Sequence, residues 1–140
     1  MSIVTAQTFL HVGIPVNDPV RARDFYVNVL GLKVDRDAEG PDASLVRLYC
    51  GDSPTPGQQV VLFRRPEPIQ RDAVAEDGHT HQAFVVSPEE FDSALVQFRE
   101  MGILHSVPII RGARHNEPHR TLYFFDPDGN YLQLADSDRG

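Results

Sequence analysis

The chain repeats one pattern of elements, and this repeat limits the folds it can adopt more than any other feature. In each half, a short apolar segment typical of a strand precedes a helix and three further strand segments. The first copy spans about residues 8–65 and the second about 79–136, with a linker at 66–78 rich in proline, charge and small residues. A period of about 70 residues is longer than solenoid repeats, so we expect one domain, 1–140, made of a duplicated module.

The two predicted helices carry the clearest local signals. The first follows the capping sequence Asn-Asp-Pro at 17–19, and the second follows Ser87 and a proline, with Glu90 completing a capping box. Gly31 and Gly102 stand where a left-handed residue ends a helix. Both helices show one apolar face at helical spacing. Its positions are Ala22, Phe25, Tyr26, Val29 and Leu30 in the first helix, and Phe91, Ala94, Leu95, Phe98 and Met101 in the second.

Eight short segments have the composition and length of strands. They are residues 9–16, 32–35, 44–50 and 58–65 in the first module, and 80–86, 106–110, 120–125 and 131–135 in the second. Each module is therefore predicted to be βαβββ.

A tight turn at 126–130, Asp-Pro-Asp-Gly-Asn, joins the last two predicted strands. Proline presets φ at a turn corner, and Gly129 accepts a positive φ without a steric cost. On the outgoing strand, alternation places Tyr131, Gln133 and Ala135 on one face and the leucines between them on the other. A polar glutamine thus lies on a strand face that is expected to be covered rather than open to solvent.

Composition excludes several classes of function. The 140-residue chain has a net charge of −7 and a pI near 5.2, which argues against binding to nucleic acid or to acidic membranes. The single Cys50 cannot form an internal disulfide, and no segment has the roughly 20 apolar residues of a membrane span. No leader sequence is evident, so we expect a soluble, cytoplasmic protein whose partners are small molecules.

Several of these segments, taken together and in order, resemble the vicinal oxygen chelate superfamily, which contains glyoxalases, bleomycin and fosfomycin resistance proteins and extradiol dioxygenases. They are the opening strand His11-Val12-Gly13-Ile14-Pro15-Val16, the helix with Phe25-Tyr26 leading to Val29-Leu30-Gly31-Leu32, the strand that begins at His81, and Tyr123 with the turn 126–130. The resemblance covers nearly the whole chain. It implies an α+β fold in which two βαβββ modules form a curved mixed sheet around a cavity, and it implies a homodimer.

The resemblance also implies a divalent metal, iron(II), manganese, zinc or nickel, and no organic cofactor. Carried over position by position, the ligands are His11, His81 and Gln133, whereas the fourth family position falls near Val61. The family usually has glutamate at the last two positions. A glutamine carbonyl can coordinate a metal, but it supplies neither a negative charge nor a base. Isomerase chemistry, which needs that base, is therefore disfavoured.

An enzyme similar to the dioxygenases fits these residues better. Tyr123 stands where extradiol dioxygenases have a tyrosine that hydrogen-bonds substrate, and His115 or His119 would supply the acid–base group. We therefore expect a metal-dependent enzyme acting on a small oxygenated or aromatic molecule. The alternative is a metal-free protein that sequesters such a molecule, as bleomycin resistance proteins do.

The remaining histidines and aromatic residues have simpler interpretations. His79 and His105 are predicted to be surface or loop residues by default, and the same default applies to His115 and His119. Five phenylalanines are assigned to the core: Phe63, Phe84, Phe98, Phe124 and Phe125.

Overall fold

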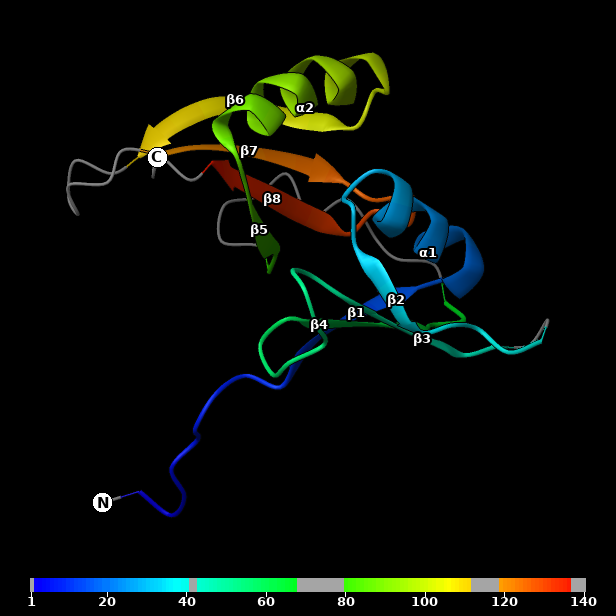
Figure 1. Ribbon diagram of the computed structural model, residues 1–140. Coiled ribbons are helices and arrows are strands. Elements are labelled where there is room, and N and C mark those ends of the chain that lie inside the picture. The colour runs from blue at the N-terminus through cyan, green and yellow to red at the C-terminus, as the bar shows by residue number, and fades with distance from the viewer. Residues whose placement is uncertain (1, 41–42, 68–79, 112–118, 137–140) are drawn as a thin grey trace. The chain divides into compact units, whose positions relative to one another are not determined.

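The computed structural model describes residues 2–40, 43–67, 80–111 and 119–136, and it divides into two compact units at residues 69 and 70 (Figure 1). The division falls inside the predicted linker, most of which lies outside the described residues. Each unit contains one module of the repeat. That the two modules form a single domain stays a prediction.

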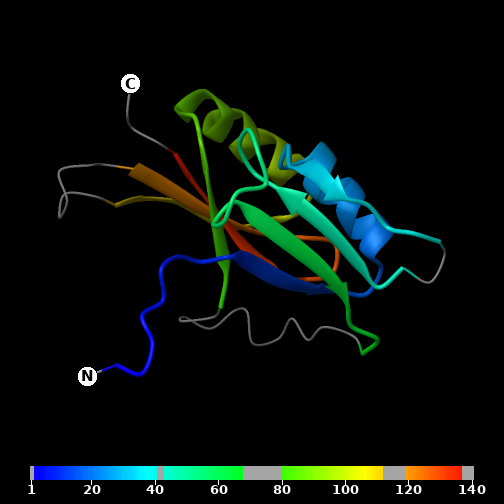
Figure 2. The same cartoon turned by 60° about the horizontal axis from the view of Figure 1, so that its bottom comes forward.

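The first unit has the predicted order of elements. These are β1 (His11–Val16), α1 (Pro19–Asn28), β2 (Lys33–Arg36), β3 (Leu45–Tyr49) and β4 (Gln59–Arg64). The sheet order is β1-β4-β3-β2, with β1 parallel to β4 and the other pairs antiparallel. Figure 2 shows β4 lying between β1 and β3.

The second unit repeats this topology. It contains β5 (Gln82–Val86), α2 (Pro88–Glu100), β6 (Leu104–Arg111), β7 (His119–Phe125) and β8 (Tyr131–Asp136). The sheet order is β5-β8-β7-β6, with β5 parallel to β8. The predicted α+β class with two βαβββ modules is confirmed. No helix in the described ranges is long and apolar enough to cross a membrane.

Both helices begin as their sequences predict, and each is followed by the predicted left-handed glycine, but α1 ends at Asn28, so Val29 and Leu30 lie just beyond it. Asp18 accepts hydrogen bonds from the first backbone amides of α1, and Ser87 forms a complete capping box with Glu90 at α2. After α2, Gly102 has φ 74°, and the amide of Ile103 donates to the carbonyl of Phe98 at 3.0 Å. This bond satisfies a helix-end carbonyl in a Schellman motif. The left-handed residue is what lets the chain turn into β6.

Each helix packs on one face of its own sheet. In the first unit, Ala22, Phe25 and Tyr26 of α1 are buried, as are the alternate strand residues Ile14, Val16, Val46, Leu48 and Leu62. In the second unit, the buried set is Phe91, Phe98, Leu122, Phe124, Leu132 and Leu134, with the rings of Phe98 and Phe124 4.6 Å apart. The core of each unit therefore uses mainly one of the two alternating sets of strand side chains, and Val61 and Thr121 are buried exceptions from the other set.

One predicted core residue is wrong. Phe63 is 40% exposed, because alternation along β4 places it on the face opposite α1. Phe84 and Phe125 are only half-buried, and Phe125 lies on the face of its sheet opposite α2. Apolar character alone therefore did not identify the face on which each phenylalanine lies.

The turn between β7 and β8 is held by one buried carboxylate. Asp126 is fully buried, and its side chain accepts from the amides of Asp128 and Asn130 at 2.9 and 2.8 Å and from the Asn130 side chain at 2.8 Å. The amide of Gly129, which has φ 94°, donates to the carbonyl of Asp126 at 3.1 Å. Hydrogen bonds to this buried side chain thus stabilise the turn that the sequence predicts.

Replacing Asp126 by alanine should destabilise the protein by about 2–4 kcal/mol, because several donors lose a charged acceptor in a buried site. Urea unfolding followed by circular dichroism measures this change. Asp52, an exposed aspartate on the first unit, provides the matched control, and its alanine variant should change stability by less than about 0.5 kcal/mol. Equal stabilities of the two variants would contradict the role of the carboxylate.

Arg120 makes a second polar anchor in the second unit. Its Nε donates to Asp136 Oδ2 at 2.8 Å, its Nη1 lies 2.6 Å from Asp92, and its guanidinium carbon lies 4.5 Å from the centre of the Phe91 ring. The hydrogen bonds to Asp136, which has the larger effect, and to Asp92 both raise the pKa of Arg120. The side chain of Asp136 is only 7% exposed, so this pair joins β7 to β8 on the core side.

Arg120→Met should cost about 2–4 kcal/mol in unfolding free energy, because the nearly buried Asp136 loses its charged partner. Asp92→Ala removes only an exposed partner and should cost less than about 1 kcal/mol. Thermal and urea unfolding of both variants separate these effects. A similar loss of unfolding free energy in the two variants would show that the pair of Arg120 with Asp136 contributes no more to stability than the exposed pair with Asp92.

Candidate functional site

The strand registers place the two predicted histidines at equivalent points of the repeat. His11 begins β1, and two residues later Gly13 pairs with Val61 of β4. His81 immediately precedes β5, and two residues later Ala83 pairs with Gln133 of β8. Val61 and Gln133 are therefore structural counterparts, as the sequence predicts.

A polar and aromatic surface covers the face of the second sheet that is turned away from α2. Tyr123 pairs with Gln133 and Phe125 with Tyr131 across the β7–β8 ladder, and paired residues lie on the same face. All four are half-buried, whereas the residues between them are fully buried under the helix. We call this surface the aromatic face, and its ring-bearing members are His81, His105, Tyr123, Phe125 and Tyr131.

The rings of the aromatic face contact one another. Tyr123 and Tyr131 are stacked, with centroids 5.1 Å apart and ring planes 12° apart. The His81 ring meets both edge-on, at 5.5 Å from Tyr123 and 5.9 Å from Tyr131. The structure therefore brings His81, Tyr123 and Gln133, three of the predicted site residues, onto one face.

His105 also belongs to this face, and the sequence did not identify it as a site residue. It lies near the start of β6, with its ring 5.2 Å from Phe125 and 5.4 Å from Tyr131, edge-on to both. The predicted strand began at residue 106, one position too late to include it. A strand starting directly after the helix-ending glycine was the available signal.

Three polar groups of this face have no hydrogen-bond partner within the described part of the chain. They are the side-chain amide of Gln133, the hydroxyl of Tyr123 and the hydroxyl of Thr121, which is buried two positions along β7. Buried or half-buried polar groups are normally satisfied. The half-buried Gln133 amide and Tyr123 hydroxyl can therefore donate to or accept from a bound molecule, whereas the Thr121 hydroxyl is buried beneath the surface.

The acid–base role of His115 or His119 stays a prediction. His115 lies outside the described residues. His119 is the first residue of β7, where it pairs with Arg111 of β6.

Among the described residues, neither unit by itself provides a full set of donors for a divalent cation. In the second unit, His81 and Gln133 share a face but bring no carboxylate, and in the first unit, the exposed His11 pairs with Gln59, whose amide donates to the carbonyl of Pro54 at 2.8 Å. Across the described ranges, no group of three or more His, Cys, Asp or Glu side chains could hold a metal. Imidazole suits iron, zinc and nickel, but one predicted histidine ligand with a neutral amide supplies too few ligands and no negative charge, so the described donor set within each unit alone is incomplete for these metals.

Comparison with solved structures gives relatives of the same fold. A glyoxalase/dioxygenase from Nostoc punctiforme matches with 25% identity over 99% of each chain and a TM-score of 0.73. A glyoxalase/bleomycin resistance protein/dioxygenase from Alicyclobacillus acidocaldarius matches with 24% identity over 93% of this chain and 91% of that one, at a TM-score of 0.61.

A third relative is a fosfomycin resistance protein, a mutant of FosX from Listeria monocytogenes in complex with Mn(II) and 1S,2S-dihydroxypropylphosphonic acid. It is 16% identical over 93% of this chain and 92% of that one, at a TM-score of 0.64. At this identity the match shows the shared fold alone. The family model for the Glyoxalase/Bleomycin resistance protein/Dioxygenase superfamily matches residues 8–134. Because this match spans both modules of the repeat, the chain belongs to the Glyoxalase/Bleomycin resistance protein/Dioxygenase superfamily.

Proposed function

We propose that the aromatic face of the second unit binds a small planar or aromatic molecule. The observation that carries this proposal is the stacked pair Tyr123 and Tyr131, flanked edge-on by His81 and His105. Four rings in contact on a face that the helix does not cover form a platform on which a flat ligand can stack.

The polar groups of the aromatic face orient the bound ligand through hydrogen bonds. Gln133 offers both an acceptor and two donors, and the hydroxyl of Tyr123 offers a donor and an acceptor. Small-molecule sites combine mostly apolar and aromatic walls with a few polar groups of this kind. The ligand class is therefore an aromatic or conjugated molecule that carries oxygen or nitrogen at its edge.

Sequestration explains these residues better than metal-dependent catalysis does. Every described side chain of the aromatic face is uncharged or a histidine, so no carboxylate is present to act as a base or to balance a dication. A binding protein needs neither group.

The second candidate is the metal-dependent enzyme that the resemblance implies, with His11, His81 and Gln133 as ligands. The matching positions of the two histidines in their units favour it. Its chemistry would be closer to that of a dioxygenase than to that of an isomerase, because glutamine cannot shuttle a proton.

Tyr131→Leu should weaken binding of a flat aromatic ligand about three- to tenfold, since it removes one ring of the stack while keeping an apolar side chain. Catechol and bleomycin serve as probes, and ligand-detected NMR gives the dissociation constants. Tyr49→Leu, on β3 of the first unit, is the matched control and should bind as the wild type does. Unchanged binding by Tyr131→Leu would refute the stacking platform.

Gln133→Glu separates the two candidates by the sign of its effects. On a metal-free aromatic face, an added carboxylate without a partner should lower the melting temperature at neutral pH and raise its own pKa by desolvation. At a metal site, it should tighten Mn(II) or Fe(II) binding about ten- to a hundredfold. Melting with metal and with chelator measures both effects. Gln97→Glu, on the exposed side of α2, is the control for added charge.

A further inference from the structure

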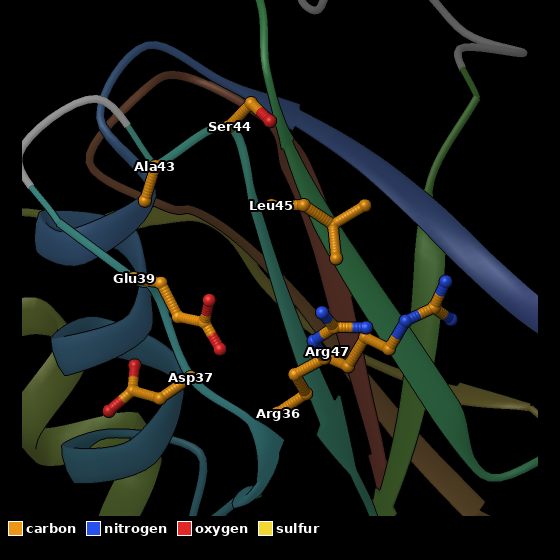
Figure 3. Close-up of a pocket in the computed structure, with 7 residues that line it drawn as sticks. All are labelled: Arg36, Asp37, Glu39, Ala43, Ser44, Leu45 and Arg47. Atoms are coloured by element: carbon orange, nitrogen blue, oxygen red, sulfur yellow. The ribbon is translucent and has the colours of Figure 1, made fainter.

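The first unit contains a pocket of about 390 Å³ that the proposed function does not use. It lies where β2 ends and β3 begins, and its walls include Arg36, Arg47, Glu39, Asp37, Ser44 and Leu45 (Figure 3). This volume is within the range of small-molecule sites.

Two arginines occupy directly opposed positions in this pocket. Arg36 of β2 and Arg47 of β3 are cross-strand partners, so their side chains leave the sheet on the same side. Like charges in this arrangement repel each other. Neither guanidinium makes a hydrogen bond or an ion pair with another described residue. The pair therefore concentrates positive charge that no ion pair with a described residue neutralises.

The two acidic residues of the pocket differ in their availability. The Asp37 carboxylate already accepts hydrogen bonds from Arg23 Nη1 and from the amide of Ala38, both at 2.7 Å. These bonds, above all the one from Arg23, lower the pKa of Asp37. Figure 3 shows the Asp37 carboxylate turned towards α1, away from the two arginines. Glu39 instead directs its carboxylate into the pocket. One acidic group thus faces two cations.

We propose that this pocket binds a small molecule carrying an oxyanion, a phosphate or a carboxylate, which Arg36 and Arg47 grip together. Two planar guanidinium groups can each form paired hydrogen bonds with such an anion, and the anion relieves their mutual repulsion. Glu39 then accepts a hydrogen bond from a hydroxyl or amino group elsewhere on the ligand. The half-buried Leu45 provides an apolar wall beside the arginines.

Solvated surface arginines are the simpler explanation of exposed positive charge, but two features argue against it here. The chain has a net charge of −7, so the pair stands out against the overall charge. Arg47 is also half-buried in the pocket wall, where an unbalanced charge costs more than at an open surface.

The proposal is tested with the full chain by calorimetry and thermal melting at constant ionic strength. Inorganic phosphate and citrate are titrated separately against a chloride background, which distinguishes phosphate from carboxylate ligands. We expect saturable binding of at least one anion and a rise in melting temperature with its concentration. Arg36→Gln and Arg47→Gln should each weaken that binding at least tenfold. Glu39→Gln should tighten it, because the amide oxygen still accepts a hydrogen bond while the negative charge that repels the anion is removed. Arg99→Gln, on α2 of the second unit, is the matched control and should bind as the wild type does.

The variants also make a prediction without any anion. If the arginines repel each other, Arg36→Gln and Arg47→Gln should melt at the wild-type temperature or above it in low salt. A lower melting temperature would mean that the pair supports the fold, and it would overturn the proposal. The proposal also fails if neither anion binds saturably, or if all the arginine variants respond like Arg99→Gln. None of these outcomes bears on the aromatic face, because the variants lie outside it.

Discussion

The burial of one face of each sheet under its own helix is the constraint on which the rest of each unit depends. Strand side chains alternate, so packing against α1 or α2 uses every second residue and leaves the others free of that demand. In β8 the two sets are clear, with Leu132 and Leu134 fully buried and Tyr131 and Gln133 half-buried. The face away from the helix can therefore carry polar and aromatic groups without cost to the core.

Duplication of the module fixes positions but not chemistry. The registers make Val61 and Gln133 counterparts, yet one is a buried aliphatic residue and the other a half-buried amide. The core positions stay apolar in both units because each helix requires it. The faces away from the helices have no such requirement, and they have become cationic at Arg36 and Arg47 in one unit and aromatic in the other.

Local sequence signals predicted the helices and strands, whereas long-range strand pairing determined which side chains share a face. Caps, glycines with positive φ and the turn at Asp126 act over a few residues, so the helices and the last hairpin could be found in the sequence. Two other features depend on where the strands start and how they pair. They are the side of the sheet on which Phe63 lies and the contact between His105 and Tyr131. A register shift between Val34 and Arg36 sets Arg36 opposite Arg47. A shift of one residue reverses every side chain, and no local pattern shows where it occurs.

The charge on each face then determines which ligands it favours. A neutral glutamine beside stacked tyrosines offers hydrogen bonds but no net charge, so a strongly anionic or cationic ligand would lose its hydration there without electrostatic compensation. The arginine pair in the first unit has the opposite property, because it gains from an anion and gains little from a neutral ring. The loss of carboxylates from the expected metal positions is consistent with this division. In the first unit, an anionic ligand atom meets its counter-charge at Arg36 and Arg47, whereas the described side chains of the aromatic face provide none.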